Sequence, residues 1–363
     1  MATALSGAAR AQGSNIVLGQ SAAFSGPAAQ LGIQFHAGAR LWFDQLNQQG
    51  GVGGHNIVIR TLDDGYEPER CAANTRQLID EDVFALFGYI GTPTSLAALP
   101  LVKREQVPFI APFTGAMGLR EPFSRYVFHL RASYNDETAL IVRQLTNLGL
   151  KKIAVFYQND SYGRAGLDGV LLALGALKLE PVAQATVERN SVDVAKALAA
   201  LLPSRPDAIV QVSAYKSCAA FIREARRAGY AGRFFNVSFV GTQALADELG
   251  KDGAGVVVSQ VVPSPYSGSK PVVLEFQDAV RRAGKTVQAN FSSMEGYLAA
   301  RLFTEGLRRA GGRSLTRDGL IAGLESLGRS SLTGFPVHLS SGSHVASSFV
   351  ELSMLTGDGR VRT

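Results

Sequence analysis

The chain has 363 residues, which is long enough for two domains that each bury a core of their own. Hydrophobic residues make up 46% and charged residues 18%, which excludes wholesale disorder, and no apolar run reaches the roughly 18 residues of a membrane-spanning helix. The formal net charge is +6, but the basic residues form no single stripe, so we expect no nucleic-acid partner. Three basic groups repeat the phrase RRAG, at 226–229, 281–284 and 308–311, which is typical of a helix C-terminus.

The N-terminal segment differs in composition from the rest of the chain. Residues 1–13 are small and weakly apolar, and Ala9-Arg10-Ala11 resembles the A-x-A cleavage site of a secretory leader. The segment lacks the charged and strongly apolar parts of a signal peptide, so we interpret it as the remnant of one, with a disordered tail as the alternative. A remnant would indicate an exported protein.

From residue 15 onward, short apolar runs alternate with amphipathic segments. This alternation predicts βαβ units and a parallel sheet with helices on both faces. A glycine cluster at 50–55 follows a predicted helix and precedes a strand, so it does not indicate a dinucleotide-binding loop. Strands are predicted at 15–22, 56–62, 83–89, 107–111 and 126–130, and helices at 30–48, 67–80 and 94–103.

A second series with the same alternation follows. Helices are predicted at 136–148, 164–177, 192–202 and 215–228, and strands at 152–157, 181–186, 208–212, 234–237 and 255–261. Three helices at 272–283, 292–310 and 316–327 come next, and residues 335–339 and 347–355 close the chain as a predicted strand pair. We therefore predict an α/β fold of two doubly wound parallel-sheet lobes, with lobe 1 at 14–130 plus 263–330 and lobe 2 at 131–262 plus 331–363.

Two strand ends of the first lobe carry the features of a binding site. In FALFGYIGTPTSLAAL (84–99) and PFIAPFTGA (108–116), an apolar run breaks at Gly, Pro and hydroxyl residues. Ligands of open α/β sheets bind at the carboxyl ends of the strands. Thr92, Thr94, Ser95 and Thr114 offer hydroxyls and backbone N–H groups there, which predicts a site for a carboxylate.

The motifs of catalysis are missing from the chain. There is no G-x-S-x-G, no H-E-x-x-H, no phosphate-binding loop and no Cys/His grouping with zinc spacing. We interpret His338 and His344 as a surface pair, and Asp63 and Asp64 as caps of the helix that begins near Glu67. We therefore expect neither an enzyme, nor a metal site, nor a cofactor.

Several phrases run along the chain in a characteristic order: FSGPAAQLG, GARLWFDQLNQQGGVGG, LDDGYEPERCAANTRQLI, FGYIGTPTS, PFIAPFTGA, YQNDSYGRAG and EGYLAARLF. Together they resemble the type I periplasmic binding proteins that serve branched-chain amino acid transporters, from about residue 15 to the end. The resemblance implies two lobes joined by a three-segment hinge. It also implies that the lobes close over the ligand and that the permease subunits of an ABC transporter recognise the closed form.

The resemblance further implies roles for five residues. Thr92 stands where the family binds the ligand α-carboxylate, and Phe113 and Thr114 stand in the loop that completes the carboxylate site. Tyr162 matches an aromatic residue that the second lobe closes over the ligand, and Tyr215 stands where another tyrosine lines the pocket. Without the resemblance, a tyrosine that opens a helix is equally typical of a half-buried cap.

One departure from the family bears on the chemistry of the ligand. Phe239, in the stretch NVSFVGTQ, stands at about the position where the amino-acid binders carry a glutamate for the ligand ammonium. Closing a cation into a cleft without a carboxylate is costly, so the departure argues against an amino acid. A branched-chain amino acid remains the alternative, in which Asp160, Asp247 or Glu295 would reach the ammonium.

Aromatic side chains gather at the same expected mouth, where Leu31 stands in place of a tryptophan of some relatives. They favour an aromatic or otherwise apolar acid, bound by hydroxyls at one end and stacked at the other. Tyr66 and Gly91 occupy positions at which some relatives have a disulfide, so that bridge is missing. The predicted ligand-binding set is Phe24, Tyr89, Thr92, Thr94, Phe113, Thr114, Tyr162, Tyr215 and Phe239.

The resemblance, together with these residues, implies a periplasmic solute-binding protein of an ABC importer, which we expect to act as a monomer and to capture a small carboxylate ligand by lobe closure. The ligand would be an aromatic or apolar acid, or a branched-chain or aromatic amino acid. Its partners would be the permease subunits, without direct insertion into the membrane. The alternative function is a ligand-sensing receptor or regulator built on the same fold.

Overall fold

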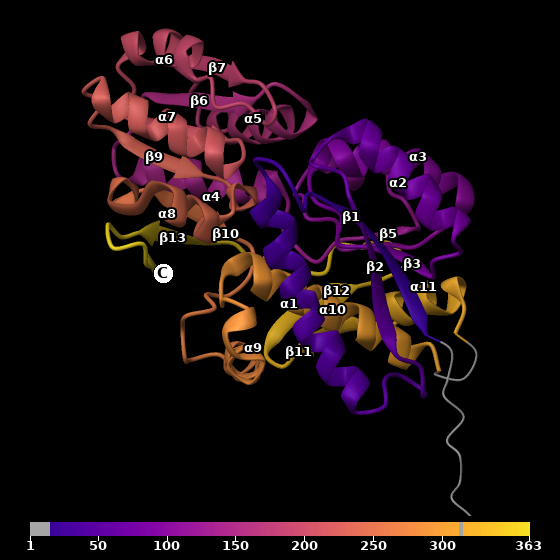
Figure 1. The fold of residues 1–363 in the computed structure, drawn as a ribbon. Coiled ribbons are helices and arrows are strands. Elements are labelled where there is room, and N and C mark those ends of the chain that lie inside the picture. The colour runs from indigo at the N-terminus through magenta and orange to yellow at the C-terminus, as the bar shows by residue number, and fades with distance from the viewer. Residues whose placement is uncertain (1–14, 312–314) are drawn as a thin grey trace, which may run out of the picture.

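Two twisted sheets organise the chain, and helices cover each of them (Figure 1). The computed structural model describes residues 15–311 and 315–363, so the expected leader remnant at 1–13 lies outside the described residues. We call the five-stranded sheet with its helices lobe 1 and the seven-stranded sheet with its helices lobe 2. The predicted fold of two α/β lobes is confirmed, whereas the predicted boundaries at residues 131, 263 and 331 stay a prediction.

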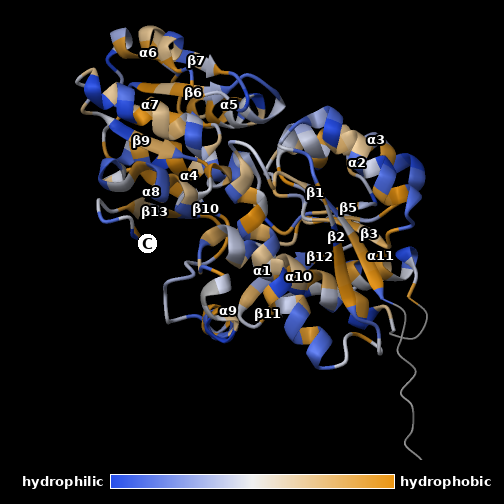
Figure 2. Cartoon of the chain, in the orientation of Figure 1, coloured by the Kyte–Doolittle hydropathy of each residue, from blue (hydrophilic) through white to orange (hydrophobic). Residues whose placement is uncertain are grey.

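Lobe 1 is built on a parallel sheet of order β2-β1-β3-β4-β5. Helices cover both faces, so the strands are apolar, and all three residues of β3 are buried. Figure 2 shows these strands as mostly hydrophobic and the outer faces of the helices as hydrophilic. The strands are β1 Ile16–Ala22, β2 Ile57–Asp63, β3 Ala85–Phe87, β4 Phe109–Ile110 and β5 Val127–Phe128. The helices are α1 Ala29–Gln48, α2 Pro68–Asp80, α3 Thr92–Glu105, α9 Pro271–Ala283, α10 Phe291–Arg309 and α11 Arg317–Glu325.

The long helices α1 and α10 lie side by side, although they come from opposite ends of the chain. Glycine permits their close approach, because a Cβ at Gly38 would meet the backbone carbonyl of Ser293. Trp42 on α1 donates a hydrogen bond from Nε1 to Oγ1 of Thr304 on α10, at 2.9 Å. The helices that follow lobe 2 in sequence therefore pack against lobe 1.

Lobe 2 is built on a sheet of order β14-β13-β10-β9-β8-β6-β7, in which β13 pairs antiparallel with both β10 and β14 and the other neighbouring strands are parallel. The strands are β6 Ile153–Gln158, β7 Ala183–Val187, β8 Ala208–Val212, β9 Arg233–Asn236, β10 Val257–Gln260, β13 Glu351–Leu355 and β14 Val361–Arg362. The helices are α4 Tyr134–Asn147, α5 Ser161–Gly175, α6 Ala195–Leu201, α7 Tyr215–Arg227 and α8 Thr242–Leu249. Helix α8 is absent from the sequence-based prediction, because eight residues carry too short a periodic pattern.

The predicted pairing of residues 335–339 with 347–355 is wrong. Strand β12 Phe335–Leu339 pairs with β11 Gly328–Leu332, and β13 pairs with β10 of lobe 2. Thr333 and Gly334 both have positive φ, at 47° and 89°, which is the backbone of a tight two-residue hairpin turn. The turn therefore returns the chain onto β11, and the segment that follows is free to join the second sheet.

The three RRAG phrases end helices, as predicted. Helices α7, α9 and α10 each end within the phrase, with two arginines in the last turn. The glycines Gly229, Gly284 and Gly311 all have positive φ, between 68° and 91°, which suits the end of a helix. These cations face helix C-termini, so their positions give no indication of a nucleic-acid site.

The two histidines predicted as a surface pair lie in different environments. His338 is exposed, but the ring of His344 stacks on Phe128 with 3.8 Å between ring centroids, and its Nε2 lies 3.1 Å from Oε1 of Glu325. The prediction is therefore wrong for His344. The reason is that residues 343–346 run beside the first crossing between the lobes: the N–H of His129 donates to the carbonyl of His344 at 2.8 Å.

The first crossing carries a buried ion pair. Arg131 follows β5, and its Nε and Nη2 donate to the two carboxylate oxygens of Glu295 on α10, at 2.8 and 2.9 Å. The two side chains are only 1% and 4% exposed. Burial alone would lower the pKa of the Arg131 guanidinium, but the Glu295 carboxylate raises it above its usual range. Arg131 therefore stays charged and fastens the hinge to lobe 1.

Breaking this pair should destabilise the chain strongly. Glu295→Ala leaves the Arg131 cation buried and uncompensated, so the free energy of unfolding should fall by about 3 to 5 kcal/mol. The measurement is urea unfolding followed by circular dichroism. The control is Asp44→Ala, which breaks the exposed Arg40–Asp44 pair on α1 and should cost no more than about 0.5 kcal/mol. A loss of the same small size in both variants would contradict the assigned role of Glu295.

The two aspartates that end β2 do not cap α2, in contrast to the prediction. The carboxylate of Asp64 accepts hydrogen bonds from Oγ of Ser21 at 2.7 Å and from the N–H of Tyr66 at 2.8 Å. Asp63 accepts from the N–H groups of Phe24 and Gly65. Both aspartates therefore hold the turn before the helix. Burial raises the pKa of Asp64 to about 6, from its usual value near 3.8.

This raised pKa predicts a pH dependence of stability. Between about pH 4 and pH 6 the folded chain holds a proton on Asp64 that the unfolded chain has released. The contribution of Asp64 to the free energy of unfolding is therefore fully present below about pH 4 and is lost as the pH rises through 6. Asp64→Asn should remove this loss, which amounts to about 3 kcal/mol between the two limits. The check compares urea unfolding of parent and variant at several pH values from 4 to 8; parallel curves would contradict the assignment.

Candidate functional site

Five aromatic residues from both lobes form one buried cluster where the strand ends of the two sheets face each other. The ring of Phe239 in lobe 2 lies 4.6 Å from Tyr162, 5.7 Å from Phe113 and 5.8 Å from Tyr66, measured between ring centroids. Tyr134 completes the cluster at 5.5 Å from Tyr162. We call these five residues the inter-lobe aromatic cluster. Each is at most 1% exposed, so the lobes enclose it completely.

Hydroxyl groups and a helix N-terminus lie beside the cluster on the lobe 1 side. Oγ1 of Thr92 and Oγ1 of Thr114 are 2.6 Å apart, and both residues are buried. Thr92 is the first residue of α3, whose first turn contains no acidic side chain and has no side-chain cap. The positive end of the helix dipole and two hydroxyls therefore face the same place, which suits an anion.

Several buried polar atoms around the cluster have no hydrogen-bond partner among the described residues. They are Oγ of Ser95, Oε1 of Gln158 and Oγ of Ser213. Buried polar groups are almost always satisfied in folded proteins, by protein, water or ligand. These three atoms come from both lobes, so a polar molecule bound between the lobes would satisfy groups that the described residues leave unpaired.

The carboxylates considered for a ligand ammonium are engaged elsewhere. Asp160 caps α5 and accepts from Nη1 of Arg189 at 3.2 Å, and Glu295 is paired with Arg131. Asp247 accepts from Nε2 of Gln243 at 2.7 Å. None of the three points its charge at Phe239 without a partner.

A fourth carboxylate, that of Glu137, lies close to the cluster and was not considered from the sequence. Its oxygens accept hydrogen bonds from the N–H of Ser238 at 2.7 Å, from Oγ of Ser238 at 3.0 Å and from Oγ of Ser259. Burial raises the pKa of Glu137 although the Arg131 cation opposes this. The carboxylate therefore holds the backbone beside Phe239 in place.

The remaining predicted site residues differ in where they lie. Phe24 and Tyr215 lie outside the inter-lobe aromatic cluster. Phe24 is half-buried beside the turn after β2, and Tyr215 lies against the backbone of Gln30 on α1. Thr94 uses its hydroxyl inside lobe 1, on the carbonyls of Ile90 and Gly91. Tyr89 points into the core of lobe 1.

The position of Tyr89 removes it from the site that we describe. Its ring packs on Phe109 with 5.0 Å between centroids, and the hydroxyl of Thr75 donates to its oxygen at 3.2 Å. Both neighbours belong to lobe 1. The residue after a strand end can face either side of a sheet, and a shift of one position reverses the face. The sequence alone gives no sign of which face Tyr89 takes.

Tyr66 and Gln158 lie at the candidate site and are absent from the sequence-based prediction. Nε2 of Gln158 donates to the hydroxyl of Tyr66 at 3.2 Å, which joins the two lobes. A Cβ at Gly91 would meet the ring of Tyr66, so the absence of a side chain at Gly91 makes room for that ring. The signal that could have found Tyr66 is its place opposite Gly91, at the positions of the disulfide of some relatives.

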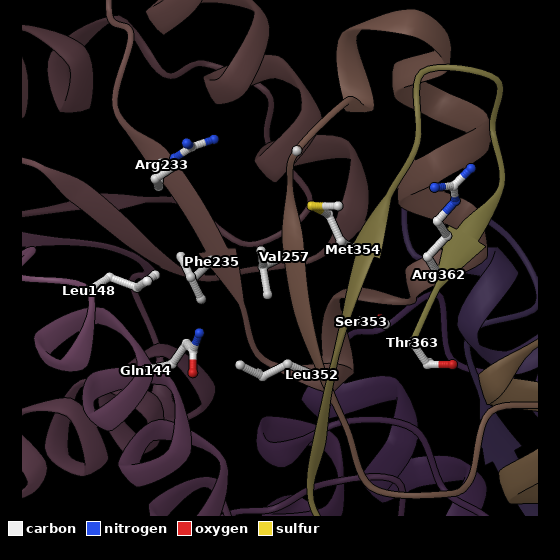
Figure 3. Close-up of a pocket in the computed structure, with 11 residues that line it drawn as sticks. Gln144, Leu148, Arg233, Phe235, Val257, Leu352, Ser353, Met354, Arg362 and Thr363 are labelled. Atoms are coloured by element: carbon white, nitrogen blue, oxygen red, sulfur yellow. The ribbon is translucent and has the colours of Figure 1, made fainter.

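A large cavity lies away from the cluster, on lobe 2 (Figure 3). It has a volume of about 480 Å³ and lies between the C-terminal end of α4 and strands β9, β10, β13 and β14. Its floor includes Phe235, Val257 and Met354. No predicted site residue lines it, so size alone does not identify the binding site.

Among residues 15–311 and 315–363, no helix is both long and apolar enough to cross a membrane. In the same part of the chain, no group of three or more His, Cys, Asp or Glu side chains is placed to hold a metal ion.

Known proteins resemble this chain in sequence and in fold. A family model described as periplasmic binding protein matches residues 15–353. The solved structure of a possible leucine/isoleucine/valine-binding protein from Rhodopirellula baltica is 36% identical, covers 98% of each chain and superposes with a TM-score of 0.92. A substrate-binding periplasmic protein from Ralstonia solanacearum is 30% identical, covers 96% of this chain and 99% of that chain, and has a TM-score of 0.89.

A further relative, found by its sequence, indicates the same family as the two structures. The Leu/Ile/Val-binding protein homolog 7 of Brucella suis is 25% identical over 331 residues, which are 86% of this chain and 81% of the relative. Proteins of this kind bind solutes and are not enzymes. The chain therefore belongs to the periplasmic binding protein family, in which the Brucella suis and Rhodopirellula baltica relatives carry the name Leu/Ile/Val-binding protein.

Proposed function

We propose that this chain is the periplasmic solute-binding protein of an ABC importer and that it captures a small carboxylate with an aromatic or apolar body. The observation that carries the proposal is Phe239. An aromatic ring, without a free carboxylate beside it, occupies the middle of the buried contact between the lobes. Membership of the family supports the role in import, for which the permease subunits would be the partners.

The hydroxyl side of the cluster supports a carboxylate as one end of the ligand. Thr92, Thr114 and the start of α3 present donors that belong to a single lobe. Oγ of Ser95, in the first turn of the same helix, is buried and has no hydrogen-bond partner among the residues that the structure describes. A carboxylate accepts up to four hydrogen bonds and gains from the positive end of a helix dipole, so it suits this end of the site better than a neutral group.

The aromatic side supports an apolar body. Rings from both lobes make up the buried contact. Tyrosine hydroxyls are neutral at neutral pH, and burial raises the pKa of Tyr66, Tyr134 and Tyr162 further. Neutral rings favour stacking with an aryl or alkyl group. Their hydroxyls still offer hydrogen bonds to a keto or hydroxyl group next to the carboxylate.

An ammonium group would find a poor environment beside Phe239. Asp160, Asp247 and Glu295 each bond to another side chain, and Glu137 accepts hydrogen bonds at both oxygens. Binding an amino acid would require one of these carboxylates to give up a partner. The names of the relatives nevertheless make leucine, isoleucine and valine the natural competitors in any test.

Closure of the lobes would provide both the affinity for the ligand and the form of the chain that the permease recognises. The cluster includes Tyr66 and Phe113 from lobe 1 and Tyr162 and Phe239 from lobe 2, so it is complete only when the lobes meet. A ligand that contacts both lobes shifts the chain toward the closed state by the difference between its affinities for the two states. The closed state would then be the form that the permease recognises.

Matched ligand pairs test the proposed ligand class. The chain is unfolded, freed of host ligand and refolded, and thermal unfolding is followed with leucine against 4-methyl-2-oxopentanoate, and with phenylalanine against phenylpyruvate. Within each pair the amino group is replaced by a keto group. We expect stabilisation by the oxo acids, amounting to about 2.7 kcal/mol at roughly 100 times the dissociation constant, and little by the amino acids. Stronger stabilisation by leucine than by its oxo acid would contradict the proposal.

A substitution at Phe239 should reverse this preference. Phe239→Glu places a carboxylate where the ammonium of an amino acid would lie, so phenylalanine should bind at least about tenfold more tightly than it binds the parent, and phenylpyruvate more weakly. Calorimetric titration gives the affinities. Phe239→Gln is the matched control, because it has the same shape and no charge. Equal effects of the two substitutions would contradict a role for residue 239 in selecting against the ammonium.

A further inference from the structure

The turn at residues 63–67 of lobe 1 makes polar contacts with lobe 2 at the edge of the inter-lobe aromatic cluster. We call this edge, where residues 65–67 face Gln158, Arg189 and Asn190, the mouth. Nη2 of Arg189 in lobe 2 lies 2.9 Å from Oε2 of Glu67. Nδ2 of Asn190 donates to the carbonyl of Gly65 at 3.1 Å and to Oε1 of Glu67 at 2.8 Å. Inside this rim, the hydroxyl of Tyr66 accepts from Nε2 of Gln158. Three consecutive residues therefore bond to three side chains of the opposite lobe.

The backbone of the turn is held in a conformation that its sequence does not favour. Tyr66 has φ of 67°, in the left-handed region that non-glycine residues adopt only at an energetic cost. This conformation turns the fully buried ring over Gly91, next to the start of α3, and against Phe239. Strain of this kind persists where the surroundings determine it, and it concentrates at functional positions.

Two carboxylates of lobe 1, those of Asp63 and Asp64, fix the backbone of the turn. Asp63 accepts hydrogen bonds from the N–H and hydroxyl of Ser25 and from the N–H of Gly65, and Asp64 accepts from the N–H of Tyr66. Lobe 2 organises the receiving side in the same way. Asp160 accepts from Nη1 of Arg189 and from Nε2 of Gln158, and it caps the helix that begins with Ser161 and Tyr162.

We propose that residues 63–67 form the closing element of the binding site, in which Tyr66 covers the ligand from lobe 1 while Gly65 and Glu67 fasten the turn to Arg189 and Asn190 of lobe 2. The inference rests on lobe closure as described in the proposed function. It assigns to Tyr66 a direct contact with the apolar body of the ligand. It assigns to Glu67 and Arg189 a positioning role, because they touch each other across the mouth and not the ligand.

These contacts should therefore affect the rate at which ligand leaves the site and not the rate at which it enters. The contacts of Glu67 and Arg189 exist only after the lobes have met, so they stabilise the closed state and not the open one. Their loss should raise the rate of ligand dissociation and leave the rate of association nearly unchanged. Stability of the ligand-free chain should not change with Glu67→Gln, because the side-chain contacts of Glu67 lie between the lobes.

The first experiment needs no ligand and therefore separates this inference from the proposed function. Cysteines are introduced by Glu67→Cys and Arg189→Cys and exposed to a short bifunctional maleimide; the native Cys71 and Cys218 are buried. The control carries Glu81→Cys with Arg189→Cys, because Glu81 lies beyond the other end of α2, about 20 Å from Glu67. We expect internal cross-linking of the 67/189 pair alone, at a rate set by how often the lobes of the ligand-free chain close. Equal rates for both pairs would overturn the inference.

The second experiment measures release by stopped-flow fluorescence with phenylpyruvate and with leucine as probes. Glu67→Gln and Arg189→Gln should each speed dissociation about threefold to tenfold, a modest factor because the pair is partly exposed. The double variant should release no faster than Arg189→Gln alone, and added salt should speed release from the parent only. Arg60→Gln, which breaks the Arg60–Glu81 pair within lobe 1, is the matched control.

Two results would overturn the positioning role: release from Glu67→Gln no faster than from Arg60→Gln, or multiplied effects in the double variant. Tyr66→Phe and Tyr66→Ala test the covering role. Tyr66→Phe keeps the ring, so it should weaken binding of whichever probe the parent binds less than Tyr66→Ala does. Equal affinities of the parent and Tyr66→Ala for that probe would overturn the covering role. If neither probe binds the parent, the proposed ligand class fails, and the cross-linking result alone decides whether the turn closes the mouth.

Discussion

The buried ion pair between Arg131 and Glu295 is the constraint on which the arrangement of the lobes depends. A cation and an anion removed from water are stable only when their geometry is close to ideal, and here two hydrogen bonds of 2.8 and 2.9 Å join them. The guanidinium also lies 4.3 Å from the centre of the Phe113 ring. The first crossing is thereby fixed to α10 and to the loop that carries Phe113 and Thr114.

The same constraint extends into lobe 2 through neighbouring charges. Arg120 donates to the carbonyls of Arg131 and Ala132, and burial lowers its pKa to about 10, so it stays a cation at neutral pH. Glu137, in the first turn of α4, bonds to the backbone beside Phe239. Two buried cations are thus balanced by two buried carboxylates, Glu295 in lobe 1 and Glu137 in lobe 2. The hinge and the aromatic cluster are parts of one electrostatic arrangement, which explains why the site forms next to the first crossing.

Much of the fold could be predicted from the sequence, because it depends on local patterns. Buried parallel strands and amphipathic helices have distinct periods, and the RRAG phrases mark helix ends by charge and glycine. The pairing of β12 with β11 could not be predicted, because it depends on the positive φ of Thr333 and Gly334. The burial of His344 depends on a crossing that is distant in sequence.

The candidate site was predictable in its location and less so in its members. Strand ends and hydroxyl residues indicate Thr92 and Thr114, and the resemblance adds Phe113, Tyr162 and Phe239; the structure brings all five together. Tyr89 and Thr94 lie on the same loops but turn into lobe 1, since side-chain direction at a strand end follows the register. Tyr66 was missed because its role arises from an unusual backbone conformation and from contacts with the opposite lobe.

The most direct test of the account is small-angle X-ray scattering of the refolded chain with and without phenylpyruvate and 4-methyl-2-oxopentanoate at saturating concentration. Scattering reports the radius of gyration, which changes when two lobes close on a hinge. The account predicts a smaller radius of gyration with a bound oxo acid than in the ligand-free chain. Identical scattering in the two states, with binding confirmed in the same sample, would contradict capture by lobe closure.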